Sequence, residues 1–417
     1  MRTRTAAALF GASMLLLAGC SPSSETPAES TSPATSTSPT TPAGPAGPIR
    51  GPQPPVVTPL VGSVLAPPVP VPATDGKVHL AYEVQLTNVL AQEVTLTSLA
   101  VLDRDVSLLE LAGEQLADLT RVVGTTTPTT KIGPAQNAVI WMDVALDKGA
   151  AVPERLVHSF SLSLPEPKPP LFPATMTIDI APTAVESRKP IVLAPPLSGP
   201  KWLNGDGCCG MSAHRLALNP IDGALWAAER YAIDYVQLQP DGRLFSGDQA
   251  KLESYSYFGA DIHAVADGPV VAAVDGLPEQ IPGKSPSGLV LDQYAGNHIV
   301  QDLGDGNYAL YAHIKTGAVK VKVGDRLTPG QVIGAVGNTG NTDAPHLHFH
   351  VMSTPDPLRS NGLPFVFDEF RLDSRVTESF ADTLLSGDPA QLQPGVAARD
   401  EKDVMPMELD VMTYADR

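Results

Sequence analysis

Positive charge is scarce in this sequence of 417 residues. It holds 28 Lys and Arg against 45 Asp and Glu, which gives a formal net charge of −17. Proteins that bind nucleic acid or an anionic membrane surface through charge need clustered Lys and Arg, and no basic stripe stands out here. The composition therefore argues against a nucleic-acid partner and against charge-driven binding to a membrane.

Aromatic residues are also few, at 5% of the chain, whereas Pro (42 residues) and Gly (35 residues) are abundant. Pro and Gly disrupt helix interiors and permit tight turns. This balance favours β-structure and loops over long helices. We therefore predict an all-β protein, with two folded domains in a chain of this length.

Cysteine occurs three times. The first, Cys20, follows a basic start and an apolar run at 6–17 that is too short to span a bilayer permanently. Residues 17–20, Leu-Ala-Gly-Cys, resemble a bacterial lipobox, in which cleavage precedes a cysteine that then receives lipid chains. We therefore expect a signal peptide at 1–19, lipidation of Cys20 and an extracytoplasmic protein anchored to the membrane by lipid.

The other two cysteines, Cys208 and Cys209, are adjacent. In an oxidising compartment they can form a disulfide with each other, pair between chains or stay free. Neighbouring side chains on a strand point apart, which disfavours a zinc site built from both of them. We favour a structural turn.

After the lipidated cysteine, residues 20–55 are rich in Ser, Thr and Pro and form a predicted linker, because this composition cannot bury a core. Short strand patterns separated by turn residues fill 56–188, which is typical of an antiparallel β-sandwich. We find no cluster of acids, bases or metal ligands there and predict a binding or spacer module. The clearest strand segments are 79–86, 94–102, 138–144, 160–164 and 176–180.

Strand patterns with Gly turns recur over 189–375, and helical periodicity is weak. This pattern predicts a second all-β domain. Residues 376–417 are acidic and irregular, and we predict a C-terminal extension with one returning strand near 405–411. The predicted strands of the second domain are 262–265, 269–274, 298–302, 308–313, 319–323, 331–336 and 346–352.

Three histidines alternate in the segment 346–350, His-Leu-His-Phe-His. Successive side chains of a strand point to opposite faces, so His346, His348 and His350 share one face while Leu347 and Phe349 face the core. Three imidazoles on one face can bind one metal ion or one substrate. The preceding segment, 334–345, is rich in Gly and Asn, which lets a backbone turn tightly and approach a ligand closely.

These segments together resemble the lysostaphin/LytM family of zinc endopeptidases, which act on peptidoglycan. The resemblance spans residues 220–352 and is most specific from the Gly-Asn-Thr-Gly motif at 337–340 to the His-x-His pair at 346–348. The Tyr-Ala-His motif at 311–313 and the strand pair at 259–276 also match. The resemblance implies a LytM-like antiparallel β-sheet domain that follows the sandwich and holds zinc in a groove.

The resemblance also implies roles for individual residues. Asp234 and His348 correspond to zinc ligands, His346 to a general base or transition-state stabiliser, and His313 to the partner of His346. A zinc ion with three protein ligands keeps a position for water, and the resulting hydroxide attacks the peptide carbonyl.

The chain departs from the family pattern at one zinc ligand. Arg230 stands where the family has a histidine four residues before the aspartate. A guanidinium has no lone pair to donate to a metal, and on the same strand face it can pair with Asp234 instead. Three interpretations remain: His214 supplies the missing ligand from an upstream loop, His350 supplies it, or the site is degenerate and binds without cutting.

Three functions follow from these interpretations. The first is a cell-envelope zinc metalloendopeptidase, a hydrolase of peptide bonds in peptidoglycan cross-links, whose partners are peptidoglycan and the membrane that holds its lipid anchor. The second is a catalytically degenerate wall-binding or hydrolase-activating lipoprotein of the same fold. The third is a periplasmic metal-binding protein that uses the three aligned histidines.

Overall fold

The computed structural model describes residues 55–378 and 384–416. The predicted signal peptide, Cys20 and nearly all of the predicted linker lie outside these ranges. Regular structure in the described residues is almost entirely strand, which confirms the predicted all-β class. The helices α1 (Gly113–Asp118) and α2 (Ala213–Leu216) are short, and none of the described helices is long and apolar enough to cross a membrane.

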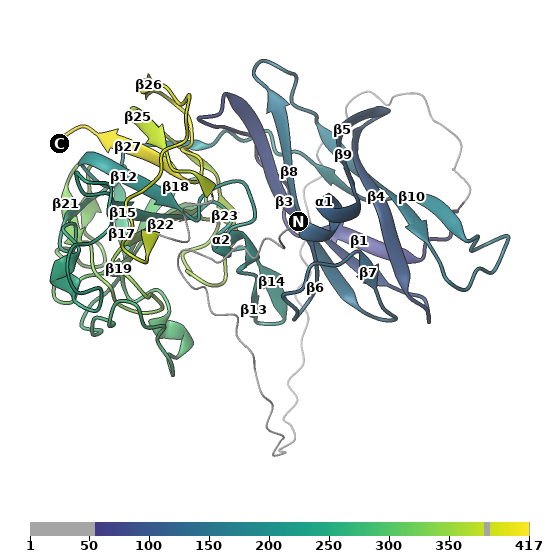
Figure 1. Ribbon diagram of the computed structural model, residues 1–417, viewed down its shortest axis with the longest axis horizontal. Helices are drawn as coiled ribbons and strands as arrows, with labels where there is room; N and C mark the ends of the chain where they lie inside the picture. The colour runs from purple at the N-terminus through teal and green to yellow at the C-terminus, as the bar shows by residue number, and fades with distance from the viewer. Residues whose placement is uncertain (1–54, 379–383, 417) are drawn as a thin grey trace, which may run out of the picture. The chain divides into compact units, whose positions relative to one another are not determined.

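The N-terminal region is an antiparallel β-sandwich, as predicted (Figure 1). Its first sheet has the order β1-β3-β8-β6 with β2 on β3, and its second has the order β10-β9-β4-β5 with β7 on β4. Buried apolar side chains from both sheets form one core. The strands are β1 (Leu60–Val64), β2 (Val71–Pro72), β3 (Lys77–Asn88), β4 (Val94–Asp103), β5 (Val106–Ala112), β6 (Thr120–Val122), β7 (Lys131–Ile132), β8 (Asn137–Asp147), β9 (Arg155–Ser163) and β10 (Thr175–Ala184).

Strand β3 is buried on both of its faces. Leu80, Tyr82 and Val84 point into the sandwich core, so the intervening residues should face solvent. Instead Ala81 and Glu83 are 0% and 1% exposed, and Ala81 belongs to the hydrophobic core of the C-terminal region. The outer face of this sheet is therefore an internal contact surface.

The C-terminal region is built on an eleven-stranded sheet of order β20-β17-β18-β19-β22-β15-β12-β27-β25-β26, with β23 on β22. Strands β26 and β27 come from the predicted C-terminal extension and pair with β25, and β27 also pairs with β12. Its strands are β12 (Gly199–Gly205), β15 (Ile233–Gln237), β17 (Gly268–Val274), β18 (Asn297–Gly304), β19 (Asn307–Ile314), β20 (Arg326–Leu327), β22 (Leu347–Met352), β23 (Gly362–Leu363), β25 (Phe370–Arg375), β26 (Arg399–Glu401) and β27 (Asp410–Tyr414).

Three further strand pairs flank this sheet, and two 3-10 turns lie between its strands. The first pair, β11 with β24, is parallel, and the other two, β13 with β14 and β16 with β21, are antiparallel. These elements are β11 (Ile191–Leu193), β13 (Asn219–Ile221), β14 (Ala224–Trp226), β16 (Asp261–His263), β21 (Val332–Ala335), β24 (Phe365–Phe367), η1 (Leu252–Ser254) and η2 (Leu291–Gln293).

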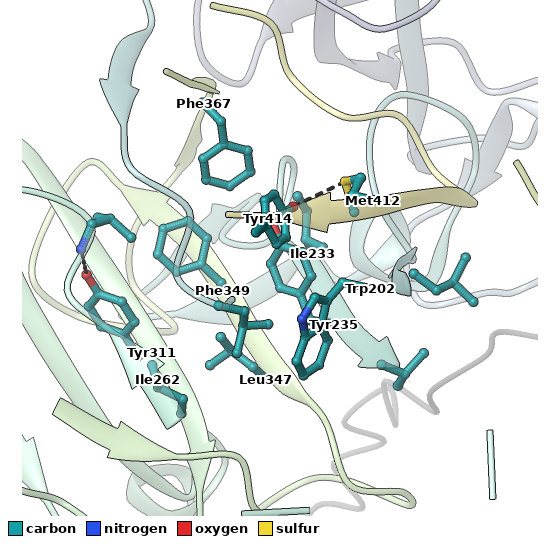
Figure 2. Packing of buried hydrophobic residues seen from close by; sticks show 14 of the residues in the cluster. Trp202, Ile233, Tyr235, Ile262, Tyr311, Leu347, Phe349, Phe367, Met412 and Tyr414 are labelled. Atoms are coloured by element: carbon teal, nitrogen blue, oxygen red, sulfur yellow. Dashed lines mark hydrogen bonds between the residues drawn. The ribbon is translucent and has the colours of Figure 1, made fainter. Parts of the chain in front are cut away.

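One face of the large sheet packs into an aromatic core (Figure 2). Leu347 and Phe349 of β22 are fully buried there, as their alternation with the histidines predicts. Burying such a side chain contributes roughly 1.5–3 kcal/mol, so this face fixes the orientation of β22. The opposite face of the same strand must then carry His348 and His350.

Cys208 and Cys209 lie between β12 and α2 and are joined by a disulfide. Both residues are buried, at 1% and 3% exposure. The sequence left three possibilities for these cysteines open, and the structure has the disulfide between the two adjacent residues.

Candidate functional site

The register of two neighbouring strands brings an aspartate and a histidine together. Asp234 of β15 lies directly opposite His348 of β22, and residues opposite each other across an antiparallel pair share a face. Oδ1 of Asp234 is 2.8 Å from Nδ1 of His348. Both side chains are buried, at 2% and 6% exposure.

His214 reaches the same carboxylate from helix α2. The hydroxyl of Ser212 accepts a hydrogen bond from the backbone N–H of Arg215 and so caps this helix. Nδ1 of His214 lies 2.9 Å from the carbonyl oxygen of Asp206. A carbonyl only accepts, so Nδ1 carries the proton, and Nε2 faces Oδ1 of Asp234 at 3.3 Å. The structure therefore brings Nε2 of His214 to the same carboxylate that His348 contacts.

His350 does not reach the carboxylate. Its Nδ1 lies 2.9 Å from Nε2 of His348, one step further along the strand. Its Nε2 is buried and has no hydrogen-bond partner among the described residues. His346, His348 and His350 all line one groove, which confirms that they share a face, but His350 contacts His348 and not Asp234.

His346 and His313 form a second pair in the groove, with ring centroids 4.6 Å apart. Nδ1 of His346 donates to the carbonyl of Ala344 at 2.9 Å, and Nδ1 of His313 donates to the carbonyl of Thr339 at 2.7 Å. These bonds fix both rings and leave Nε2 as the atom for other chemistry. Nε2 of His346 lies 3.4 Å from Oδ1 of Asp234.

The backbone of His313 has φ 60°, in the left-handed region that non-glycine residues seldom occupy. Such strain is typical of functional sites, where the surrounding structure holds the residue in place. The fixed ring of His313 fits this pattern.

Arg230 does not pair with Asp234, although the sequence allowed that pairing. The arginine lies in the turn before β15, which begins at Ile233, so it does not share the strand face of Asp234. Its Nε donates to the carboxylate of Glu83 in β3, at 3.1 Å to Oε1 and 2.9 Å to Oε2. Nη2 donates to the same carboxylate. Asp234 is thus left to the histidines.

The buried charges of the groove shift its pKa values strongly. Burial would raise the pKa of Asp234, but His214, His346 and His348 outweigh it and hold this pKa well below its usual range. Burial would lower the pKa of His214, but the charge of Asp234 raises it to about 10. Burial and the neighbouring imidazoles hold the pKa of His313 and of His350 well below normal. A single carboxylate serves several imidazoles, so some of the rings stay neutral and keep a lone pair.

The donor types of the groove, imidazole nitrogen and carboxylate oxygen, are ones that zinc binds. In the groove, two overlapping groups of residues could hold a metal: His214, Asp234 and His348, or His313, His346 and His348. Tetrahedral zinc with bonds of roughly 2.0–2.1 Å has ligand atoms about 3.3 Å apart. The separation of 3.3 Å between His214 Nε2 and Asp234 Oδ1 matches that edge, and the first group has the mixed nitrogen and oxygen donors common in catalytic zinc sites.

Two residues near the site were missed from the sequence, Glu83 and Arg215. Both are nearly fully buried, at 1% and 2% exposure, and form an ion pair at 3.5 Å. Glu83 occupies a position in β3 whose parity predicts a solvated side chain. Arg215 follows His214 directly, and nothing in the local sequence marks it as buried.

The fold and the groove together define a class of domain: an antiparallel β-sheet whose polar face gathers histidines around one aspartate. Residues 255–360 match the family described as peptidase family M23, so the chain contains a peptidase M23 domain. The matched range includes His313, His346 and His348. His214, Arg230 and Asp234 precede it.

Relatives with established names share part of this domain. The chain is 36% identical over 67 residues to peptidoglycan DD-endopeptidase ShyA of Vibrio cholerae, which covers 16% of this chain and 15% of that protein. It is 33% identical over 108 residues to glycyl-glycine endopeptidase ALE-1 of Staphylococcus capitis, which covers 26% of this chain and 25% of that protein. The chain thus spans about a quarter or less of the length of these relatives.

The catalytic domain of lysostaphin from Staphylococcus simulans aligns at 24% identity with a TM-score of 0.22, over 39% of this chain and 88% of that domain.

Proposed function

We propose that this protein is a zinc metalloendopeptidase that hydrolyses peptide bonds in the cross-links of peptidoglycan. The observation that carries the proposal is the position of His214, whose Nε2 lies 3.3 Å from Oδ1 of Asp234. This histidine would supply the third donor, in place of the histidine that the family has at the position of Arg230. The peptidase M23 domain and the two relatives named as endopeptidases support the reaction class.

His214, Asp234 and His348 would hold the zinc. When bound, zinc acts as a Lewis acid that polarises a peptide carbonyl and makes water a nucleophile near neutral pH. In two of these ligands the other ring nitrogen also has a partner. Nδ1 of His214 is bound to the carbonyl of Asp206, and Nε2 of His348 lies against His350. Such contacts orient metal ligands and set their protonation.

His346 and His313 are left to move protons and to stabilise charge. Each ring is tied through Nδ1 to a backbone carbonyl, so Nε2 either accepts a proton from the attacking water or donates one to the oxyanion and the leaving amine. A positioned general acid or base contributes about 10²–10⁴-fold to a rate. Both histidines line the same groove as the proposed ligands.

The groove offers surfaces for such a peptide. Its lining includes the polar residues Tyr294 and Asn341 and the apolar residues Pro357 and Leu358. Mixed lining of this kind is typical of sites that bind a peptide backbone through hydrogen bonds and its side chains through contact.

The test measures zinc content and cleavage of purified muropeptides with the same preparations. We expect wild-type protein to bind one zinc ion and to cleave. His313→Ala should keep the zinc and lose the cleavage, because His313 lies outside the proposed ligand set. Protein that folds but binds no zinc would contradict the enzyme and favour the degenerate wall-binding protein. Zinc binding without cleavage would favour a metal-binding protein.

We also propose an extracytoplasmic location with a lipid anchor at Cys20. The support is the sequence of residues 1–20. In cells, Cys20→Ala should move the protein from the membrane fraction to the soluble fraction. Unchanged membrane association of that variant would contradict the lipid anchor.

A further inference from the structure

Of the three proposed zinc ligands, His348 lies on β22 and the other two lie on separate segments. The outer face of the N-terminal sandwich contacts both of those segments. One segment is helix α2 with His214, and the other is the turn before β15 with Asp234. The contact residues of the sandwich lie on β3 and β8. These two strands pair with each other, and Glu83 of β3 lies opposite Trp141 of β8. Both of these residues are buried, at 1% and 3% exposure.

The residue after His214 is held from several directions. The guanidinium of Arg215 lies 3.5 Å from Glu83 and donates to the backbone carbonyls of Met142 at 3.1 Å and Tyr82 at 3.4 Å, all in the sandwich. The indole N–H of Trp141 donates to the backbone carbonyl of Arg215 at 2.5 Å. Both the side chain and the backbone next to His214 are therefore fixed by the sandwich.

The turn before Asp234 is held by the same strand. Arg230 donates through Nε to both carboxylate oxygens of Glu83, and the hydroxyl of Tyr231 donates to the carbonyl of Ala81 at 3.2 Å. The carbonyl of Ala232, between this turn and Asp234, lies 3.3 Å from Nδ1 of His214. The two ligand segments thus meet each other and share one carboxylate of the sandwich.

Glu83 is the point where these contacts converge. It is a single buried carboxylate between two buried guanidinium groups, and a charge can be buried only when it is paired and hydrogen-bonded. An amide at this position keeps the shape of the side chain but removes the negative charge that draws the two arginines together. The segments of His214 and Asp234 would then separate or repack.

We propose that Glu83 is a positioning residue for the zinc site, so that the N-terminal sandwich is part of the metal centre and not a spacer. Acting through Arg215 and Arg230, it sets the distance between His214 and Asp234. This inference rests on the proposed function, because it assigns a purpose to the ligand set proposed there.

The experiment measures zinc affinity of the full chain by competition with a chromophoric chelator, at a temperature far below unfolding. Glu83→Gln should weaken zinc binding about tenfold, the lower end of the effect of losing an outer contact of a metal site. Glu83→Asp keeps the charge on a shorter side chain and should fall between Glu83→Gln and wild type. Trp141→Phe removes the N–H that binds Arg215, together with part of the buried ring, and it should weaken binding to a smaller extent.

Thr120→Val is the matched control. Its hydroxyl is fully buried and donates to the carbonyl of Leu116 at 2.7 Å, entirely within the sandwich. This variant loses a buried hydrogen bond of the same region without touching either ligand segment. It should bind zinc as tightly as wild type.

The outcomes separate this inference from the proposed function. Wild-type protein that binds zinc and cleaves, together with folded Glu83→Gln of unchanged affinity, overturns the role of Glu83 alone. A loss in Thr120→Val as large as that in Glu83→Gln also overturns it, because general destabilisation would then explain both. If Glu83→Gln does not fold, unchanged affinity in Trp141→Phe is decisive against the inference. Wild-type protein without zinc binding overturns both proposals.

Discussion

The sandwich and the groove each contain a cluster built around buried histidine, and the two clusters have opposite ratios of histidine to carboxylate. In the sandwich, His79 lies between two carboxylates, with Nδ1 3.0 Å from both oxygens of Asp143 and Nε2 3.1 Å from Asp75. In the groove, Asp234 serves His214, His346 and His348, at 3.3, 3.4 and 2.8 Å.

This difference in ratio decides what each cluster can do. Burial alone would lower the pKa of His79, but Asp143 and Asp75 raise it to about 9, and each nitrogen of the ring already faces one of these two carboxylates. Cys209 lies close to His79 and Asp143, but its sulfur is in the disulfide. The sandwich cluster is therefore an ion pair, whereas the groove has more imidazoles than its one carboxylate can keep charged. The presence of metal-ligating residue types in a cluster is not enough to predict a metal site.

We predict the largest effect for a substitution of His348 in the groove. His348→Ala removes the histidine that belongs to both possible donor groups, so we expect loss of zinc binding and of muropeptide cleavage together. Elemental analysis of the purified protein and a cleavage assay measure this. His79→Ala is the matched control in the sandwich and should keep its zinc. Zinc retained by His348→Ala, or lost from His79→Ala, would reverse the comparison.

The next effect distinguishes the two histidines that were candidates for the missing ligand. His214→Ala should weaken zinc binding at least about 100-fold, because loss of a direct ligand exceeds the 10–100-fold loss expected for an outer contact. His350→Ala removes only the contact to Nε2 of His348 and should cost less. Chelator competition gives both affinities. The opposite order of the two variants would assign the ligand to His350.

A third effect concerns stability and a third buried cluster, that of Arg230 and Glu83. Arg230→Met removes one partner of a buried ion pair, and Arg215 lies further from Glu83, at 3.5 Å. We expect a loss of about 3 kcal/mol in the free energy of unfolding, at the low end for a broken buried pair. Denaturant titration measures it. The exposed pair of Arg359 with Asp222, at 2.6 Å, is the control, and Arg359→Met should cost less than about 1 kcal/mol. Equal losses in the two variants would contradict a structural role for Arg230.

The smallest effect is the pH dependence of the sandwich cluster. The folded protein raises the pKa of His79 from 6.5 to about 9, so its ion pairs stabilise the fold fully below pH 6.5 and lose that contribution as pH rises through 9. The difference in unfolding free energy between wild type and His79→Gln should therefore be largest at pH 6 and shrink towards pH 10. A difference that stays constant over this range would show that His79 is not held in its charged form.

Local sequence was sufficient for the shared face of the histidines and for most of the predicted strands, although the predicted strand at 319–323 is wrong. Alternation along 346–350 correctly placed Leu347 and Phe349 in the core, because the period of a strand fixes which side chains share a face. The same rule failed on β3, where Glu83 has the parity of a solvated residue but is covered by another part of the chain. The outer face of β3 is buried by residues far along the chain, so the local sequence pattern cannot predict its burial.

The site was predictable only where residues are neighbours in sequence or in the family pattern. The distance between His214 and Asp234 depends on how helix α2 packs beside β15, and the partner of Arg230 lies 147 residues earlier in the chain. The sequence therefore left His214 and His350 as alternatives and allowed Arg230 to pair with Asp234. Long-range packing decides both questions.

The most direct measurement is X-ray absorption at the zinc edge, which counts the imidazoles bound to zinc in wild-type protein and in His214→Ala. We predict two imidazoles and one carboxylate in the wild type, with one imidazole fewer, or no bound zinc, in the variant. Three imidazoles in the wild type that remain unchanged in His214→Ala would show that the metal is held by His313, His346 and His348, and would contradict the assignment of His214 as the replacement ligand.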